Sequence, residues 1–141
     1  MWLWTHSLSI ALLSLIPNLF PVAIIFGVMG YTGITLDIAT AVIAAIVIGV
    51  AIDDTIHFLH HWREGATQNL SWKDNVTHTY KRAGRAILLT TLLLLIGFPL
   101  MMFSQLKSVA YFGLLTSIAA FSALVADLFL LPLLLRLYTK K

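Results

Sequence analysis

Two adjacent aspartates, Asp53 and Asp54, lie inside a long apolar stretch of the sequence. A charged carboxylate near the centre of a bilayer costs at least about 2.5–3.5 kcal/mol by insertion scales. Burial disfavours the charged form of a carboxyl group, and a second carboxyl beside it disfavours that form further. Such a pair can take up and release protons near neutral pH. We therefore predict a proton-coupling site, in preference to a hydrogen bond that only joins helices.

A third acid, Asp127, is expected at the same membrane depth as this pair. Asp53 and Asp54 precede Arg63 by ten and nine residues, and Asp127 precedes Arg136 by nine residues. At about 1.5 Å per helical residue, each interval is about 14–15 Å. The two stretches run in the same direction across the membrane. The three carboxyl groups are therefore predicted to lie in one layer of the bilayer.

Two threonines on the third apolar stretch add hydroxyl groups near this layer. That stretch runs in the opposite direction from the two stretches that carry the acids. Thr90 and Thr91 follow Arg85 by five and six residues, which is about 8–9 Å along a helix. We therefore expect Thr90 and Thr91 to supply hydroxyls on the inner side of the acidic cluster.

Three histidines follow the acidic pair toward the end of its stretch. His57 is four residues after Asp53 and three after Asp54, so its imidazole can contact either carboxyl. Because histidine titrates near neutral pH, one interpretation of His57 is a proton path from the acids to the membrane surface. The other interpretation is a place among the lipid headgroups. For His60 and His61 the headgroup position is favoured.

The same run permits one interpretation based on a metal. Asp53, His57 and His61 follow one another at four-residue steps, and imidazole and carboxylate groups are ligands that suit zinc. Transport of a divalent cation is therefore an alternative function. The run also matches one histidine box of the membrane di-iron desaturases, but those enzymes need three such boxes. The sequence therefore predicts no enzyme activity, no cofactor and no resident metal.

Small residues share a helix face with the acids in two of the apolar stretches. The Gly113–Asp127 stripe repeats at three- and four-residue spacing and comprises Gly113, Thr116, Ala120, Ala123 and Asp127. The comparable Gly49–His60 stripe comprises Gly49, Asp53, His57 and His60. Small residues let helix backbones approach closely in lipid. Both stripes are therefore expected to point into the helix bundle and away from lipid.

The composition indicates which elements hold these groups. Of the 141 residues, 60% are hydrophobic and only 11% are charged. A water-soluble domain has roughly a quarter of its residues charged, so soluble, disordered and nucleic-acid-binding proteins are disfavoured. About 20 apolar residues cross a bilayer as a helix, and the chain is long enough for about four such helices. The predicted fold is an all-α polytopic transmembrane helical bundle, with residues 1–141 as a single membrane domain.

Four apolar stretches define the spans of this bundle. They cover about residues 7–30, 36–60, 85–103 and 111–138, and a polar loop at 62–84 joins the second span to the third. Pro17 and Pro21 predict a break in the first helix, because proline cannot donate a backbone hydrogen bond. Gly97 and Pro99 predict a kink in the third helix.

The positions of the basic residues predict the orientation of the chain. Eight of the nine lie at one end of the predicted bundle, whereas Lys107 lies at the other end. Positive residues favour the cytoplasmic side, so the 62–84 loop and both termini are predicted to be inside the cell. Within that loop, Ser71 and Asp74 resemble a capping box and predict a short cytoplasmic interfacial helix. The positive charge therefore requires no nucleic-acid partner.

Tryptophan and tyrosine residues mark the expected membrane surfaces. All eight lie at or just beyond the ends of the predicted helices: Trp2, Trp4, Tyr31, Trp62, Trp72, Tyr80, Tyr111 and Tyr138. Amphipathic rings favour the membrane–water interface, so this placement supports the spans. The chain has no cysteine, which excludes disulfides and thiolate ligands. Its N-terminus has no basic residue before the apolar run, so no cleaved signal peptide is expected.

Several segments together carry a resemblance to a known family. They are Leu15-Ile-Pro-Asn-Leu-Phe-Pro21, Gly33-Ile-Thr-Leu-Asp37, Gly49-Val-Ala-Ile-Asp53-Asp54-Thr-Ile-His57-Phe-Leu, Gly84-Arg85-Ala86-Ile87 and Ala126-Asp127-Leu128 through Pro132. On these segments the chain resembles the resistance–nodulation–division (RND) superfamily over nearly its whole length. It is most similar to the lipid-exporter, MMPL-like branch, which also resembles the Patched and sterol-sensing membrane halves.

The resemblance implies a proton-driven exporter of hydrophobic or lipid-like compounds in a bacterial plasma membrane. The family's acids that match Asp53 and Asp54 are its proton-coupling site. Full-length members have two such membrane halves and two large porter domains, so the chain is expected to be the last four helices of the second half. Its expected partners are membrane lipid, a hydrophobic or lipid substrate, and the remaining transporter half or another copy of the chain. A sterol- or lipid-sensing membrane module without transport is an alternative.

Overall fold

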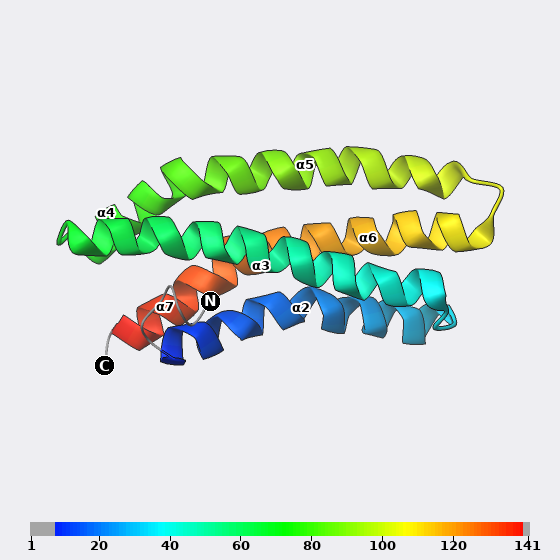
Figure 1. The fold of residues 1–141 in the computed structure, drawn as a ribbon, viewed down its shortest axis with the longest axis horizontal. Coiled ribbons are helices and arrows are strands. Elements are labelled where there is room, and N and C mark those ends of the chain that lie inside the picture. The colour runs from blue at the N-terminus through cyan, green and yellow to red at the C-terminus, as the bar shows by residue number, and fades with distance from the viewer. Residues whose placement is uncertain (1–7, 140–141) are drawn as a thin grey trace.

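Within the part of the chain that the structure describes, four helical stretches are long and apolar enough to cross a membrane. The computed structural model describes the backbone of residues 8–139 and the side chains of residues 12–38 and 40–137. Within this range the helices form one elongated antiparallel bundle without strands (Figure 1). The all-α transmembrane fold predicted from composition is confirmed.

The spans are built from helices of different lengths. In chain order the helices are α2 (Leu8–Thr32), α3 (Ile38–Thr67), α4 (Trp72–Thr79), α5 (Arg85–Leu100), α6 (Lys107–Val125) and α7 (Leu131–Thr139). Between them lie the π-helical turns η1 (Tyr80–Gly84) and η3 (Ala126–Leu130) and the 3-10 turn η2 (Met101–Phe103). Because η1 joins α4 directly to α5 and η3 joins α6 directly to α7, the third and fourth spans each continue through a π-helical turn.

Helix α6 is the central element of the bundle, since it packs against α2, α3 and α5. Its approach to α5 is very close at Gly113. A Cβ atom on Gly113 would lie 2.5 Å from the carbonyl oxygen of Phe98 and 2.9 Å from Cβ of Met101. The residues of the Gly113–Asp127 stripe are all buried. The predicted inward direction of this stripe is therefore confirmed.

The start of α3 is determined by a local cap. Gly33 in the preceding turn has φ +71°, a conformation that favours glycine. Asp37 then accepts a hydrogen bond from the backbone N–H of Thr40 at 2.8 Å, and Thr40 Oγ1 accepts one from the backbone N–H of Asp37 at 2.7 Å. This reciprocal capping box begins α3 at Ile38 and so determines how far along the helix its acids lie.

The predicted break in the first helix is wrong. Helix α2 continues through Pro17 and Pro21, and both proline side chains are buried against the rest of the bundle. Proline is tolerated inside a membrane helix when neighbouring groups satisfy the backbone that it frees. In the third helix, a change of helix type takes the place of the predicted kink. Gly97 and Pro99 lie in the last turn of α5, and the 3-10 turn η2 follows directly.

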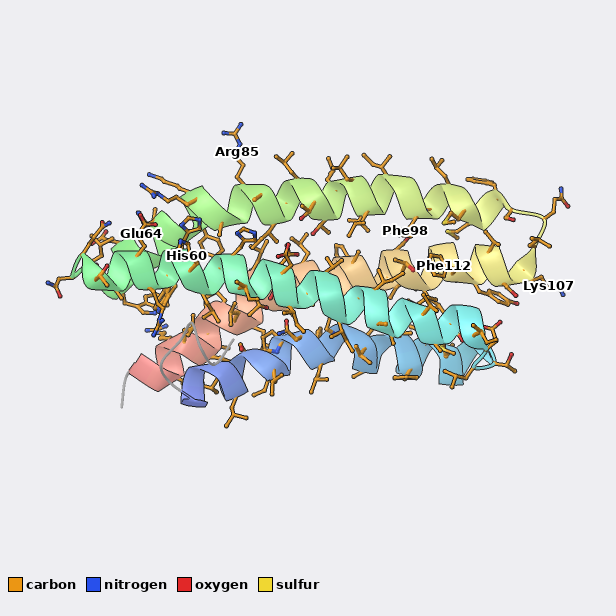
Figure 2. All side chains as sticks on the ribbon, viewed as in Figure 1. His60, Glu64, Arg85, Phe98, Lys107 and Phe112 are labelled. Carbon is orange, nitrogen blue, oxygen red and sulfur yellow. The ribbon has the colours of Figure 1, made fainter. Side chains whose placement is uncertain are left out.

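The short helix predicted in the polar loop is present as α4. The Ser71 hydroxyl oxygen accepts from the backbone N–H of Asp74 at 3.4 Å and caps it. Figure 2 shows Arg85 toward the α4 end of the bundle and Lys107 at the opposite end. We call these the α4 end and the Lys107 end. The described basic residues other than Lys107 belong to the α4 end, whereas the predictions for Trp2, Trp4, Lys140 and Lys141 fall outside the described residues.

The predicted aromatic belt is only partly correct. Tyr31 is 94% exposed, as expected at a membrane surface. Trp62, however, is only 6% exposed and packs in an apolar cluster. The Tyr80 hydroxyl donates a hydrogen bond to the backbone carbonyl of Leu128, so this ring joins η1 to η3. A position near the end of a helix therefore did not reveal whether a ring faces lipid or a neighbouring helix.

Two apolar clusters occupy the two halves of the bundle. The cluster at the α4 end consists of Phe58, Leu59, Trp62, Ala83, Ile87, Leu131 and Leu135. The cluster nearer the Lys107 end consists of Ile25, Met29, Ile43, Val47, Leu115 and Ala119. Along α3 and along the fourth span, the acids lie between residues of one cluster and residues of the other.

Candidate functional site

A layer of buried polar side chains lies between the two apolar clusters. It contains Asn18 of α2, Asp54 and Thr55 of α3, and Asp127 of η3, and we call these four residues the polar layer. Each is at most 5% exposed. Buried polar groups are costly in a membrane interior unless they are hydrogen-bonded, so their meeting at one level of the bundle is a specific feature of this fold.

Thr55 joins three helical segments through its hydroxyl group. Its Oγ1 lies 2.8 Å from Oδ1 of Asn18 and 2.8 Å from Oδ1 of Asp127. A hydroxyl has one proton and can donate it to only one of these acceptors. The second contact therefore needs a proton from the other side, either from a protonated Asp127 or from the Asn18 amide turned so that Nδ2 faces Thr55.

Each of these two arrangements corresponds to a different charge on Asp127. When Asp127 is protonated, it donates to Thr55, and Thr55 donates to Asn18. When Asp127 is ionised, it accepts from Thr55, and the turned amide of Asn18 donates to the hydroxyl. The Nδ2 atom of Asn18 has no hydrogen-bond partner among the described residues, so this amide is available to change its direction. The network therefore accommodates both protonation states of one buried acid.

Asp127 lies in the π-helical turn η3, which interrupts the fourth span. Such turns within α-helices occur frequently at functional sites. The second carboxylate oxygen, Oδ2, is buried and has no hydrogen-bond partner within the described part of the chain. The Tyr80 hydroxyl contacts this turn, because it donates a hydrogen bond to the backbone carbonyl of Leu128. The carboxyl of Asp127 is thus held by one oxygen only.

Asp54 faces the same layer from α3. It is 5% exposed and directly precedes Thr55, whose hydroxyl contacts Asp127. No salt bridge to Asp54 or Asp127 is formed by the residues that the structure describes. No Lys or Arg occurs between Ile38 and Phe58 or between Ser108 and Leu135. Along these helices the nearest Lys or Arg residues are therefore Arg63 and Arg136, each nine residues from a buried acid.

Asp53 faces away from this layer, which corrects the predicted direction of its stripe. Its side chain is 73% exposed and that of His57 is 59% exposed, with His57 Nε2 lying 3.9 Å from Asp53 Oδ1. Gly49 and His60 are exposed as well, so the whole Gly49–His60 stripe lies on the surface of the bundle. Successive helical residues point about 100° apart, so packing Asp54 inward turns Asp53 outward.

The predicted threonines do not reach the acids. The Thr90 hydroxyl donates to the backbone carbonyls of its own helix, at 3.2 Å from Ala86 and 3.0 Å from Ile87. Thr91 is 2% exposed, so it does face the bundle interior. Among the described residues, neither threonine forms a hydrogen bond with a carboxyl group of the polar layer. The hydroxyl that binds Asp127 comes from Thr55 instead.

The ligand set proposed for a divalent cation is not brought together. His61 Nδ1 lies 3.1 Å from Oε2 of Glu64, whereas His57 lies near Asp53. Among the described side chains, no group of three His, Cys, Asp or Glu residues is placed to hold a metal ion. The described geometry therefore gives no support to cation transport through Asp53, His57 and His61.

Sequence reasoning missed Asn18 and Thr55 as members of the site. Asn18 lies between two prolines in an apolar run, and a polar residue inside a span marks a contact with another helix. Thr55 directly follows the acidic pair, but its own short side chain gave no sign of two long-range hydrogen bonds. Its two contacts bridge 37 and 72 residues of sequence, and only packing of the helices creates them.

Comparison with known proteins places the chain in a family. Residues 2–136 match the family described as Patched SSD. The chain is 32% identical to protein dispatched homolog 3 of Gallus gallus and 30% identical to that of Homo sapiens, over 90% of its length. It is 29% identical to the Methanocaldococcus jannaschii protein MJ1562 over 89% of its length.

These relatives are much longer than this chain. The chain spans 32% of the archaeal relative and 9% of the dispatched proteins. No solved structure matches it. The family match over residues 2–136 and the four apolar helices nevertheless both support a membrane module. The chain belongs to the Patched family, and it is an integral membrane module of the sterol-sensing, RND-like type.

Proposed function

We propose that this chain is the membrane portion of a proton-motive-force-driven exporter of hydrophobic or lipid-like compounds. The observation that carries the proposal is the pair of buried acids at one level of the bundle: Asp127 contacts Thr55, the residue next to Asp54, and neither acid forms a salt bridge with a described residue. A buried acid in a membrane is stable only when it is neutral or paired, so changes in its protonation are coupled to changes in packing. This is the property that a proton-coupling site requires.

Asp127, Thr55 and Asn18 supply a way to couple the proton to helix positions. Protonation of Asp127 reverses the direction of the Thr55 hydrogen bonds, as the single hydroxyl proton requires. The three residues belong to η3, α3 and α2, so the change acts on three segments at once. Loss of the proton adds a negative charge beside Asp54, and repulsion between the two carboxylates then favours their separation. Alternation between these states is the proposed conformational step.

The outward stripe supports the proposal that the chain functions with a second membrane component. Asp53 and His57 are both more than half exposed in a helix that is long and apolar enough to span a membrane. Ionisable groups in membrane spans generally face a bundle interior or an aqueous cavity. We therefore propose that the Gly49–His60 stripe packs against the remaining transporter half or another copy of the chain. In that assembly Asp53 joins Asp54 in the proton-coupling site.

We propose that the chain is not an enzyme. Its proposed partners, orientation and location follow from its family and its charge. Membrane lipid and a hydrophobic or lipid substrate are its proposed small-molecule partners. The basic residues at the α4 end favour a cytoplasmic position for that end, with N-in and C-in orientation. A bacterial plasma membrane is the proposed location; the relatives described above come from an archaeon and from vertebrates.

A sterol- or lipid-sensing module without transport is the second candidate function. It is favoured by the match to the Patched SSD family. A sensor needs a change of shape when lipid binds, but it does not need a proton gradient. The response to the gradient therefore distinguishes the two functions.

The test is proton-gradient-driven efflux of a hydrophobic dye from vesicles that contain the complete transporter. Asp54→Asn should reduce efflux to background while membrane insertion and folding remain intact, because asparagine is a neutral near-isostere of protonated aspartate. Asp53→Asn is expected to act in the same way in the assembled protein. Asp74→Asn, which changes an exposed acid of α4, is the matched control and should leave efflux unchanged.

Two results would overturn the proposal. Retained efflux in both the Asp53 and Asp54 variants would leave the acids as packing groups, because asparagine still forms hydrogen bonds between helices. Binding of sterol or lipid by a complete protein whose wild-type form shows no gradient-dependent efflux would establish the sensing function instead.

A further inference from the structure

The α4 end of the bundle contains two neighbouring hollows that the proton-coupling site does not use. The larger has a volume of about 600 Å³ and is lined by Trp62, Trp72, Asn75 and Arg136, among other residues. The smaller has a volume of about 200 Å³ and lies between the segment α4–η1 and the segment η3–α7. Trp72 and Arg136 line both hollows. The two hollows are therefore parts of one groove, and they meet at Trp72 and Arg136.

The groove has a positive group at its middle. The Arg136 guanidinium carbon lies 4.9 Å from the centre of the Trp72 ring, an arrangement that holds the charge over the aromatic face. Among the described residues, the side chains that line the two hollows include no acid. A planar guanidinium is well suited to bind a phosphate group through two parallel hydrogen bonds. The groove therefore presents at this point a group whose chemistry suits an anion.

The two sides of Arg136 differ in polarity. The smaller hollow is lined mainly by apolar side chains: Val76, Leu128, Phe129, Pro132 and Leu133. Phe129 is 70% exposed and Leu133 is 52% exposed, so this side opens onto the surface of a membrane-spanning helix. The larger hollow contains the amides of Asn69 and Asn75 and two indole rings. A ligand that fits the whole groove thus has an apolar part, a negative group and a polar part in that order.

A buried contact joins α3 to α4 at the larger hollow. Asn75 is 4% exposed, and its Nδ2 donates to the backbone carbonyl of Trp62 at 3.1 Å. Its side chain lies directly against Gly65, where a Cβ atom would collide with Asn75 Oδ1. This contact holds α4 close to α3 at the base of the hollow. The shape of the groove therefore does not depend on flexible side chains alone.

We infer that this groove binds an anionic phospholipid. Its acyl chain lies along Phe129 and Leu133, its phosphate binds Arg136 beside Trp72, and its polar headgroup enters the larger hollow. Inorganic phosphate lacks the part that the apolar hollow accommodates, and a sterol lacks the negative charge. The level of the groove agrees with this assignment, because the other basic residues of the α4 end place lipid headgroups there. The inference does not depend on proton coupling.

The test measures quenching of tryptophan fluorescence by lipids with brominated acyl chains. The full 141-residue chain is placed in phosphatidylcholine nanodiscs, with Trp2→Phe and Trp4→Phe so that Trp62 and Trp72 give the signal. Increasing amounts of brominated phosphatidylglycerol are compared with equal amounts of brominated phosphatidylcholine. We expect about a fivefold preference for phosphatidylglycerol, the effect of one basic residue near a lipid phosphate. Added inorganic phosphate should not displace the lipid.

Charge variants determine whether the groove causes the preference. Arg136→Gln should abolish it, and Arg136→Lys should restore part of it, since lysine keeps the charge without the planar stacking geometry. Arg85→Gln is the matched control, because Arg85 also belongs to the α4 end but points away from the bundle (Figure 2). Circular dichroism of each variant verifies that the helices are retained.

Three outcomes would overturn the inference. An unchanged preference in Arg136→Gln would mean that the groove does not select the phosphate. An equal loss in Arg85→Gln would mean that surface charge in general attracts the lipid. Displacement of brominated phosphatidylglycerol by inorganic phosphate would mean that the site recognises a free anion.

Discussion

The two stripes of small residues, alike in sequence, have opposite positions in the structure. The Gly113–Asp127 stripe of the fourth span lies inside the bundle, and its glycine allows α5 to approach at van der Waals distance. The Gly49–His60 stripe of α3 lies on the surface, and a Cβ atom on Gly49 would meet nothing within 4 Å. The first stripe therefore has its neighbour within this chain, whereas the second has open space beside Gly49.

The difference teaches how to interpret such a stripe in a membrane protein. Small residues and a buried acid indicate that another helix packs closely, but they do not identify the helix. On α6 the neighbour belongs to the same chain. On α3 the proposal assigns the neighbour to a second membrane component. The four predictions that follow test this contrast, from the largest expected effect to the smallest.

The first prediction concerns cross-linking through the outward stripe. The chain contains no cysteine, so Gly49→Cys introduces a single reactive thiol. In membranes that contain only the 141-residue chain, oxidation should convert most of this variant into a disulfide-linked dimer if another copy covers the stripe. Leu93→Cys is the matched control, since Leu93 is 70% exposed on α5 but lies outside the stripe. Equal cross-linking of the two variants would show that the stripe has no specific neighbour.

The second prediction compares the two glycines directly. Gly113→Ala should destabilise the chain by about 1–3 kcal/mol, because the new methyl group meets the backbone of α5 and overpacks the interface. Gly49→Ala should be neutral or stabilising by up to about 1 kcal/mol, since alanine has the higher helix propensity and space is available. Thermal unfolding in detergent, followed by circular dichroism, measures both. Similar losses for the two variants would contradict the contrast between the stripes.

The third prediction isolates the polar layer. Thr55→Val removes the hydroxyl that contacts Asn18 and Asp127 and leaves both side chains without this buried partner. A loss of about 1–3 kcal/mol in unfolding free energy is expected. Thr90→Val makes the same change where the hydroxyl bonds only its own helix, and it should alter stability by less than about 0.5 kcal/mol. Equal losses of unfolding free energy in the two variants would contradict the bridging role of Thr55.

The fourth prediction concerns the exposed contact between Asp53 and His57. His57→Gln should change the stability of the isolated chain in detergent by less than about 0.5 kcal/mol, because both groups are largely exposed and 3.9 Å apart. The same substitution should reduce efflux in the complete transporter, where the stripe is proposed to be covered. A large loss of stability in the isolated chain would mean that this face already supports the fold.

The sequence by itself determined the class of protein and the level of the acids. Apolar stretches of about 20 residues require a bilayer, because no water-soluble surface with so few charges would be stable. The start of α3 also follows from local chemistry, since the Asp37 cap uses residues only three positions apart. Counting along each helix then placed the acids at one depth, and the contact between Asp127 and Thr55, the residue next to Asp54, agrees with that count.

Only the tertiary structure decided which side of each helix faces the bundle. Asp53 and Asp54 are neighbours with the same side chain, and hydropathy does not distinguish them. The rotation of α3 depends on packing against α2 and α6, which turns Asp54 inward and Asp53 outward. The bridge from Thr55 to Asn18 and Asp127 arises in the same way, because it joins residues that are 37 and 72 positions apart and meet only after the helices pack. Local sequence specifies where along a helix a group lies, whereas the contacts between helices specify which way it points.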